Sequence, residues 1–205
     1  MVIQKQVISH LTAADARLAA IIGAVGDYTI KCKSEPFRSL VEAIIYQQLA
    51  GSAADAISAR FMKLYRGRFP APARLLSTPD EILRTAGLSG KKIEYMKDLA
   101  ARVSEGRLDL SGLAAMGDEQ VVERLDEVRG IGRWTAEMFL IFCLGRPDVL
   151  PVGDYGLRKA MQKTYRLRDL PLPARMEKIA EPWRPYRSVA TWYMWKSLEK
   201  FKAIG

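Results

Sequence analysis

The segment Leu125-Asp-Glu-Val-Arg-Gly-Ile-Gly-Arg-Trp-Thr-Ala136 holds the features that decide the fold of this 205-residue chain. Apolar side chains at positions 121, 122, 125 and 128 repeat at the helical period and stop at the turn Gly130-Ile-Gly132. A second helix, predicted over residues 133–144, begins directly after that turn. The segment therefore predicts two helices joined by a tight hairpin within residues 120–144.

The turn of this hairpin has the chemistry of an anion site. Gly130 and Gly132 allow a positive φ and let another backbone come close. Main-chain amides at the start of the second helix point outward and, with the helix dipole, favour a phosphate group. Arg129 and Arg133 flank the turn and add charge for backbone contacts. The turn also offers a site for a monovalent cation, Na⁺ or K⁺, on the main-chain carbonyls of Asp126, Val128 and Ile131.

Helix signals recur along the rest of the chain. Helices are predicted over about 12–25, 36–49, 52–68, 78–87, 89–105, 118–128, 133–144, from 154 onward and over most of 186–201. The residues expected to cap them are Thr12, Ser52, Ser89 and Asp118, with a capping box at Thr78-Pro79-Asp80-Glu81 and Pro36 in a first turn. Alternating strand patterns are scarce, so we predict an all-α fold.

Composition restricts the chemistry. Lys and Arg exceed Asp and Glu by 32 to 23, a net charge of +9 that predicts affinity for a polyanion such as nucleic acid. Cys32 and Cys143 are too few for a four-cysteine zinc or iron–sulfur site, and the lone His10 leaves no room for histidine-based catalysis. No targeting or membrane segment is visible, so we expect an intracellular protein.

A glycine turn alone also fits an ordinary corner between helices, but three further motifs accompany it. Asp154 closes the loop Gly145-Arg-Pro-Asp-Val-Leu-Pro-Val-Gly-Asp and lies 22 positions after Gly132 (154 − 132). Trp183-Arg-Pro-Tyr-Arg-Ser188 precedes Trp192-Tyr-Met-Trp195, and Ala43-Ile-Ile-Tyr-Gln-Gln-Leu49 ends an early helix. Over residues 37–200 the chain resembles the helix-hairpin-helix DNA glycosylase superfamily, most of all its alkylation-repair branch of 3-methyladenine DNA glycosylase II type.

The resemblance implies one domain with two helical lobes and an active-site cleft between them. Lobe one covers about residues 36–145, including the hairpin, and lobe two covers 1–35 plus 146–205. It also implies a compact form without the amino-terminal β-domain of some members, acting as a monomer on double-stranded DNA that contains damaged bases. We expect no cofactor beyond the cation at the hairpin. We expect the protein in the cytoplasm or nucleoid of a prokaryote, or in the nucleus of a eukaryote.

The chemistry of such an enzyme assigns roles to particular side chains. A base must be flipped out before its N-glycosidic bond can be cut, and Gln48, Leu49 or Leu88 is expected to fill the gap. The expected base pocket, in which aromatic faces bind a cationic purine, consists of Trp134, Trp195, Tyr46, Tyr155 and Met138, the last at a position where the family has tyrosine. Tyr193 is a weaker candidate, while Trp183 and Trp192 are expected in the core.

Asp154 is the expected catalytic carboxylate, which stabilises positive charge on the sugar and orients water. The same residue is also a candidate N-cap of the next helix.

Trp134 stands where bifunctional members carry a nucleophilic lysine, so the resemblance implies a monofunctional glycosylase for alkylated purines without lyase activity. The alternatives are a glycosylase for deaminated or oxidised bases, and a non-catalytic DNA-binding protein. Arg158, Lys159, Lys163 and Arg187 are expected on the solvated basic face.

Overall fold

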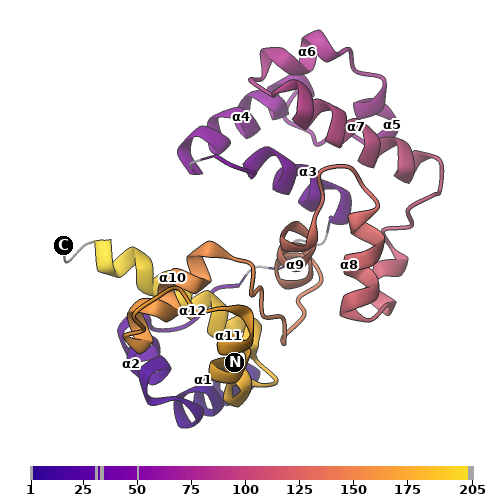
Figure 1. Ribbon diagram of the computed structural model, residues 1–205. Helices are drawn as coiled ribbons and strands as arrows, with labels where there is room; N and C mark the ends of the chain where they lie inside the picture. Colours follow the sequence, from indigo (N-terminus) through magenta and orange to yellow (C-terminus); the bar gives the residue numbers. More distant parts are fainter. Residues whose placement is uncertain (1, 31, 33–34, 50, 203–205) are drawn as a thin grey trace. The chain divides into compact units, whose positions relative to one another are not determined.

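The computed structural model describes residues 2–30, 32, 35–49 and 51–202, and no strand occurs among them (Figure 1). The all-α prediction is confirmed. The chain divides into two compact units: unit 1 contains residues 1–32 and 145–205, and unit 2 contains residues 33–144. Each unit has its own apolar core and is described by itself. Among the described residues, every helix is too short or too polar to cross a bilayer.

Unit 2 carries the hairpin. Its helices are α3 (Pro36–Tyr46), α4 (Gly51–Leu64), α5 (Pro72–Leu76), α6 (Asp80–Thr85), α7 (Gly90–Ser104), α8 (Asp118–Asp126) and α9 (Arg133–Phe142), with a 3₁₀ turn η1 (Gly112–Ala115). Helix α7 packs against α3, α5 and α6, while α3 also contacts α4 and α9, and α8 packs on α9. The helical apolar stripes meet in a core that includes Leu40, Ile44, Phe61, Met96, Leu125 and Leu140.

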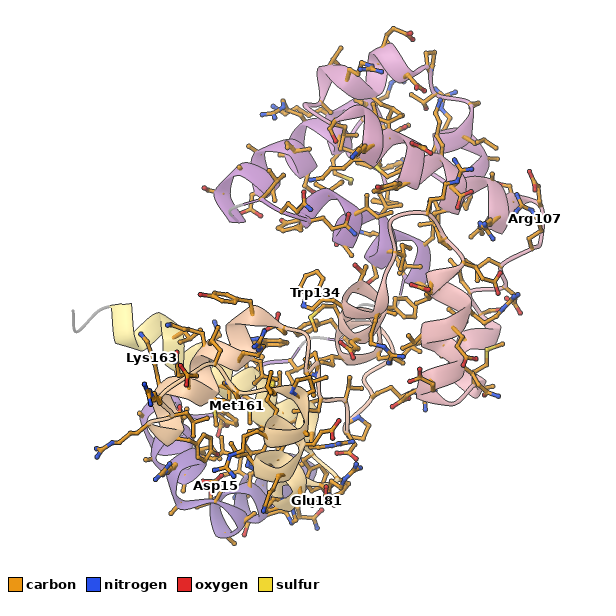
Figure 2. All side chains as sticks on the ribbon, in the orientation of Figure 1. Asp15, Arg107, Trp134, Met161, Lys163 and Glu181 are labelled. Atoms are coloured by element: carbon orange, nitrogen blue, oxygen red, sulfur yellow. The ribbon has the colours of Figure 1, made fainter. Side chains whose placement is uncertain are left out.

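Unit 1 combines the two ends of the chain. Its helices are α1 (Val2–Ala14), α2 (Ala16–Val25), α10 (Tyr155–Tyr165), α11 (Pro173–Ala180) and α12 (Arg187–Lys202), with a 3₁₀ turn η2 (Glu181–Trp183). Helix α12 packs against α2 and α10, and α1 packs on α2 and η2. Met161 of α10 is fully buried in this unit (Figure 2). Trp183 and Trp192 are buried as predicted; burying one large apolar side chain contributes about 1.5–3 kcal/mol.

A polar contact joins the chain ends inside unit 1. Asp15 Oδ1 caps α2 by accepting from the amides of Arg17 (2.9 Å) and Leu18 (3.1 Å). Its Oδ2 accepts from Trp183 Nε1 at 3.1 Å and from the Tyr165 hydroxyl. Burial raises the pKa of Asp15, but the hydrogen bonds outweigh it, so the pKa lies below its ordinary value. The charged carboxylate therefore ties α2 to residues about 150 positions away along the chain.

Several predicted caps are wrong. Thr12 lies inside α1, and the break between α1 and α2 occurs at Asp15, whose side chain satisfies the first-turn amides. Ser52 and Asp118 lie within the first turns of α4 and α8 instead of preceding them. The Thr78 hydroxyl donates to the Arg74 carbonyl at 2.8 Å and is therefore not used in a capping box. Ser89 does cap α7, accepting from the Lys92 amide, and Pro36 is the first residue of α3, both as predicted.

Candidate functional site

The hairpin turn of unit 2 has the backbone conformation that its glycines allow. Gly130 has φ of +78°, in the left-handed region where other residues are strained. The Ile131 amide donates to the Val128 carbonyl at 3.0 Å and closes the turn. Gly132 is the N-cap of α9 and supplies no side-chain oxygen to the first-turn amides. The amides at the start of α9 therefore have the chemistry that favours an anion, and the phosphate role of the turn stays a prediction.

Helix α7 forms the platform on which this turn rests. A Cβ added at Gly130 would lie 2.0 Å from Cδ2 of Tyr95, so the aromatic ring packs directly on the glycine. The Arg129 amide donates to Asp98 Oδ2 at 3.0 Å. Burial raises the pKa of Asp98, but the hydrogen bonds from Arg129 and Arg102 outweigh it and leave the pKa below its ordinary value. A charged carboxylate thus fixes the entry to the turn.

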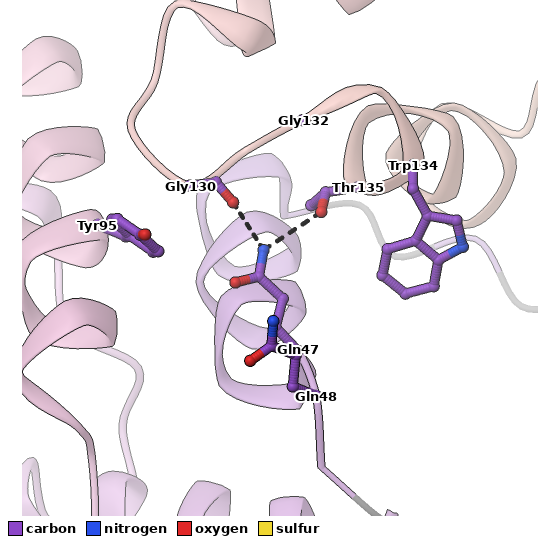
Figure 3. A pocket seen from close by; sticks show the side chains of 7 residues that line it. All are labelled: Gln47, Gln48, Tyr95, Gly130, Gly132, Trp134 and Thr135. Atoms are coloured by element: carbon purple, nitrogen blue, oxygen red, sulfur yellow. Dashed lines mark hydrogen bonds between the residues drawn. The ribbon is translucent and has the colours of Figure 1, made fainter. Parts of the chain in front are cut away.

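A second connection joins the turn to the end of α3. Gln47 Nε2 donates to the Gly130 carbonyl at 2.7 Å and to Thr135 Oγ1 at 3.3 Å (Figure 3). Lys92 Nζ donates to the carbonyls of Ile45 at 2.7 Å and Gln47 at 2.9 Å, where a cation also complements the helix dipole. Burial lowers the pKa of Lys92. The residues after α3 are therefore held from both α7 and the hairpin.

These contacts border a hollow of about 360 Å³ on unit 2 (Figure 3). Its lining consists of Gln47, Gln48, Tyr95, Gly130, Gly132, Trp134 and Thr135. Trp134 lies in the first turn of α9 (Figure 2), and its side chain is 43% exposed. A large aromatic side chain exposed at the start of a helix suits ligand contact better than core packing.

The predicted plug residues have different surroundings. Gln48 is exposed and has φ of +56°, and Leu49 is also exposed. A left-handed non-glycine residue is uncommon and stores strain of about 1–2 kcal/mol. Leu88, by contrast, is 4% exposed, and the neighbouring Ala86 carbonyl accepts from Arg60 Nε at 2.9 Å. The prediction that Leu88 fills the gap in the DNA is wrong, because this buried side chain would have to leave the core to enter a duplex.

The remaining base-pocket candidates of unit 2 lie on two helices. Tyr46, the last residue of α3, is exposed, and its hydroxyl donates to Asp55 of α4. This hydrogen bond, with burial and the negative charges nearby, raises the pKa of Tyr46 to about 12. Met138 lies half-buried on α9, four positions after Trp134 and hence near the same helical face.

Both hairpin arginines carry ion pairs. Arg129 Nη1 lies 2.7 Å from Glu94 Oε1, and Arg133 Nη1 lies 3.0 Å from Glu119 Oε2. The paired side chains are all largely exposed. Exposed pairs of this kind are worth about 0–1 kcal/mol, so either arginine can exchange its carboxylate for a phosphate at little cost.

The cation predicted at the hairpin depends on three carbonyls. That of Val128 already accepts from the Ile131 amide, which uses one of its two lone pairs. Carbonyl oxygen is a hard ligand that suits an alkali cation. The donor set of Asp126, Val128 and Ile131 is therefore compatible with Na⁺ or K⁺, and the cation stays a prediction.

Unit 1 holds the predicted catalytic carboxylate. Asp154 is the N-cap of α10, and its Oδ1 accepts from the Leu157 amide at 2.5 Å and from Trp195 Nε1 at 2.8 Å. A Cβ at Gly156 would lie 3.1 Å from this Oδ1 and 3.4 Å from Trp195 Cδ1, so a larger residue there would crowd both groups. Asp154 is thus a cap and at the same time a carboxylate in a fixed orientation.

The aromatic residues around Asp154 differ in exposure. Tyr155, at the start of α10, is 65% exposed, and Trp195 is half-buried. Tyr193 is fully buried, and its hydroxyl donates to the Gly26 carbonyl at 2.8 Å. Tyr193 is therefore a core residue of unit 1, and its weaker assignment to the base pocket is wrong.

Sequence reasoning missed the residues that support the site. Three side chains hold the hairpin turn or the end of α3 through tertiary contacts, which no local sequence pattern indicates: Gln47, Tyr95 and Lys92. Arg187 was expected on the solvated face, but its side chain is only 15% exposed and is paired with Asp148. The motif Trp183-Arg-Pro-Tyr-Arg-Ser188 was the one signal that could have singled out Arg187.

Comparisons with known proteins identify the family of the chain. Residues 41–185 match the model of the HhH-GPD superfamily of base excision DNA repair proteins. The chain is 36% identical over 193 residues to DNA-3-methyladenine glycosylase 1 of Schizosaccharomyces pombe, covering 92% of this chain and 85% of that protein. A structure of the 3-methyladenine DNA glycosylase Mag1 from S. pombe in complex with abasic DNA superposes with a TM-score of 0.87, 33% identity and coverage of 95% and 97% of the two chains. DNA-3-methyladenine glycosidase of Bacillus halodurans gives a TM-score of 0.82 and 38% identity, with coverage of 96% and 91%.

Proposed function

The chain belongs to the HhH-GPD superfamily of base excision DNA repair proteins, and on this premise we propose that it is a monofunctional DNA glycosylase that removes alkylated purines. The substrate is double-stranded DNA with a base such as 3-methyladenine or 7-methylguanine, and the product is an abasic site. The observation that carries the proposal is a carboxylate, Asp154, held by Leu157 and Trp195 in a chain whose relatives are named DNA-3-methyladenine glycosylases.

Unit 2 binds the DNA backbone in this proposal. The amides at the start of α9 receive a phosphate, and Arg129 and Arg133 contact neighbouring phosphates. Gln48 and Leu49, exposed beside the hairpin, enter the stack where the damaged nucleotide has left it. Unstacking a nucleotide costs a few kcal/mol, and less for a damaged base, which contributes to selectivity.

Aromatic faces recognise the flipped base by its charge. Methylation at N3 or N7 makes a purine cationic, and one well-placed ring attracts a cation by about 0.5–2 kcal/mol. Trp134 and Trp195 supply the strongest such faces, and Tyr46 is a further aromatic candidate on unit 2. The same charge makes the base a good leaving group, so no strong general acid is required.

Asp154 acts on the sugar. As the bond from C1′ to the base nitrogen breaks, its electron pair leaves with the base and positive charge develops on the deoxyribose. The carboxylate of Asp154 stabilises this charge, orients a water molecule towards C1′ and takes up the proton that this water releases. Trp134 occupies the place of the lysine nucleophile of bifunctional enzymes, so the strand is not cut.

The direct test is base release from methylated DNA. The wild-type protein is expected to free 3-methyladenine, and Asp154→Asn to lose at least about two orders of magnitude in rate, the usual contribution of a positioned acid–base group. Asp169→Asn is the matched control, because it makes the same change at an exposed position of unit 1. Gel analysis of the product without alkali should show intact strands.

Other outcomes would overturn the proposal in distinct ways. Release of a deaminated or oxidised base alone, from a panel of single-lesion duplexes, would retain the enzyme class and change the substrate. Binding to DNA that contains an abasic analogue, with no base released even at enzyme excess, would indicate a non-catalytic binding protein. Strand cleavage with the properties of a lyase would remove the monofunctional assignment.

A further inference from the structure

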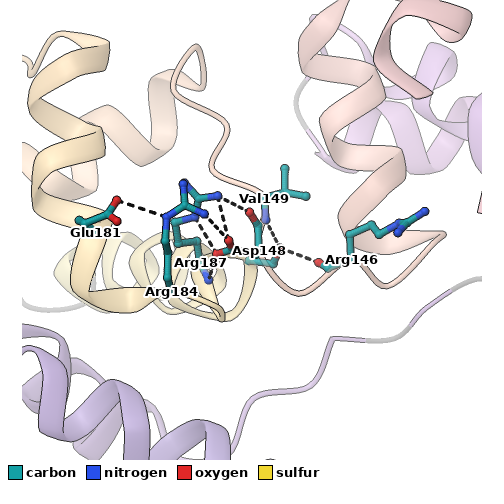
Figure 4. Close-up of polar contacts among 7 residues, drawn as sticks. Arg146, Asp148, Val149, Glu181, Arg184 and Arg187 are labelled. Atoms are coloured by element: carbon teal, nitrogen blue, oxygen red, sulfur yellow. Dashed lines mark hydrogen bonds and ion pairs between the residues drawn. The ribbon is translucent and has the colours of Figure 1, made fainter. Parts of the chain in front are cut away.

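The segment that leads to Asp154 is bonded to the first turn of α12 (Figure 4). Arg187 Nε donates to Asp148 Oδ1 at 2.7 Å, while Nη2 donates to Oδ2 at 3.0 Å and to the Asp148 carbonyl at 2.7 Å. Arg187 therefore holds the main chain of this segment as well as the carboxylate. A planar guanidinium suits such a fork of contacts, and a lysine cannot reproduce it.

Ser188 binds the same segment on either side of Asp148. Its hydroxyl donates to the Arg146 carbonyl at 2.7 Å and accepts from the Val149 amide at 2.9 Å. Its own amide donates to the Pro147 carbonyl at 3.0 Å. Ser188 is 2% exposed and Val149 is buried, so removal of the hydroxyl would leave the Val149 amide without this acceptor at a buried position.

The chain between Asp148 and Asp154 is short and internally bonded. The Val152 amide donates to the Leu150 carbonyl and the Asp154 amide to the Pro151 carbonyl, both at 2.9 Å. Val149 and Pro151 are buried. We therefore expect a displacement of Asp148 to reach Asp154.

Helix α12 contacts both ends of the segment from Arg146 to Asp154. Arg187 and Ser188, in the first turn of the helix, bind the beginning of the segment. Trp195, two turns later in the helix, donates to Asp154 at the end of the segment. Eight residues of helix span about 12 Å. The helix thus provides a rigid reference against which the position of the carboxylate is set.

We propose that Arg187 and Ser188 are positioning residues for Asp154, acting through residues 146–149. The inference rests on the proposed function. A catalytic group must be held within about 0.5 Å of its productive place, and an error of about 1 Å can cost two orders of magnitude in rate. These residues touch neither DNA nor base in this role, so they affect the chemical step and not the binding of DNA.

The test separates binding from chemistry. For Arg187→Met we expect the single-turnover rate of 3-methyladenine release to fall about 10- to 100-fold. The dissociation constant for a duplex with an abasic analogue should change less than about twofold. Arg184→Gln is the matched control, because Arg184 binds the same carboxylate at 2.6 Å from a side chain that is 48% exposed and that also pairs with Glu181. Its rate should fall no more than about twofold.

Two further variants guard against a simple loss of folding. Ser188→Ala removes only a hydroxyl and is expected to lower the rate about tenfold, again with DNA binding retained. Arg187→Lys should recover part of the rate lost in Arg187→Met. Circular dichroism at the assay temperature establishes that each variant is folded. A rate loss that scales with the unfolded fraction would refute the positioning role.

A double-mutant cycle that combines Arg187→Met with Trp195→Phe gives the second readout. Because Arg187 and Trp195 are both proposed to act on Asp154, the combined loss in rate should be smaller than the product of the single losses. Multiplicative losses would refute the inference, as would a normal rate in both Arg187→Met and Ser188→Ala. The proposed function fails separately, if Asp154→Asn retains wild-type base release.

Discussion

Trp195 Nε1 donates to Asp154 Oδ1 at 2.8 Å, so an aromatic residue expected to bind the base is also a hydrogen-bond donor to the proposed catalytic carboxylate. The indole has one polar group, and that group is used here. A hydrogen bond at Nε1 uses the edge of the ring, whereas cation–π binding of a base uses its face. Orientation of Asp154 and cation–π binding of the base are therefore two separable functions of one side chain.

The substitution Trp195→Phe distinguishes these two functions. Phenylalanine keeps an aromatic face but removes the donor, and a hydrogen bond to a charged group contributes about 1.5–3 kcal/mol. We expect a loss of about tenfold or more in the single-turnover rate of base release, with less than a threefold change in affinity for methylated DNA. Trp195→Leu, which removes the ring as well, should weaken both. Equal rates for wild type and Trp195→Phe would show that the bond does not contribute to catalysis.

The two glycines of the hairpin predict opposite phenotypes on substitution by alanine. At Gly130 the added Cβ meets the Tyr95 ring and the residue has a positive φ, so Gly130→Ala should destabilise the fold by about 2 kcal/mol or more. For a protein of this size that corresponds to a fall of about 4–8 °C in Tm. Thermal denaturation followed by circular dichroism measures it, and an unchanged Tm would contradict the contact.

At Gly132 the new methyl group meets nothing within 4 Å, and φ is −97°, which alanine adopts freely. Gly132→Ala should therefore keep Tm within about 2 °C of wild type. It should nevertheless weaken DNA binding about tenfold, because the methyl group separates the start of α9 from a phosphate. Fluorescence anisotropy with a duplex containing an abasic analogue gives the affinity. Normal binding by Gly132→Ala would remove the phosphate role proposed for this turn.

The neighbouring glutamines should separate in the same way. Gln48 is exposed, so Gln48→Ala should leave Tm unchanged while lowering base release about tenfold, since unstacking is then less well compensated. Gln47 binds the Gly130 carbonyl and Thr135, so Gln47→Ala should lower Tm as well. Fluorescence of 2-aminopurine beside the lesion reports the flipping step. A normal flipping signal with Gln48→Ala would exclude Gln48 as the plug.

Local sequence signals predicted the parts of the molecule that local physics decides. The hairpin depends on glycines at fixed spacing beside an apolar stripe, and the cap at Asp154 depends on its own main chain. The caps at Thr12 and Thr78 were wrong because a hydroxyl residue marks a helix start only where the helix begins. Helix α1 runs through Thr12, and the Thr78 hydroxyl donates back to the Arg74 carbonyl.

Tertiary contacts decided the remaining errors. Arg187 pairs with Asp148, which lies 39 positions away in the sequence. The sequence shows that a residue is basic, but not whether its side chain is paired or solvated. Leu88 follows Gly87 in a loop that predicts exposure, but the side chain fills the core of unit 2. Neither outcome follows from the helical period of apolar residues, because that period describes one helix and not the contacts that its ends make with other segments.

The ion pairs of the hairpin arginines compete with DNA for the guanidinium groups. Binding of DNA should also weaken with salt, because each phosphate contact lowers the logarithm of the association constant by about 0.9 per tenfold rise in salt concentration. Glu119→Gln removes the carboxylate that competes for Arg133, so affinity for DNA should rise about threefold, in line with an exposed pair. Glu123→Gln, also exposed and on α8, is the control for loss of negative charge alone. Equal effects of the two changes would show that Arg133 is not specifically involved.

The hydrogen bond between Tyr46 and Asp55 predicts a shift that ultraviolet titration detects. The pKa of Tyr46 is raised from 10.0 to about 12, so the folded state holds this proton more tightly than the unfolded state. The resulting stabilisation is fully present below pH 10 and is lost as pH rises from about 10 to about 12. Asp55→Asn removes both the acceptor and its charge, and should return the titration of Tyr46 towards 10. The difference in tyrosinate absorbance between Asp55→Asn and the double variant with Tyr46→Phe isolates this residue. A midpoint near 10 in the otherwise unaltered protein would show that Asp55 does not hold the phenol.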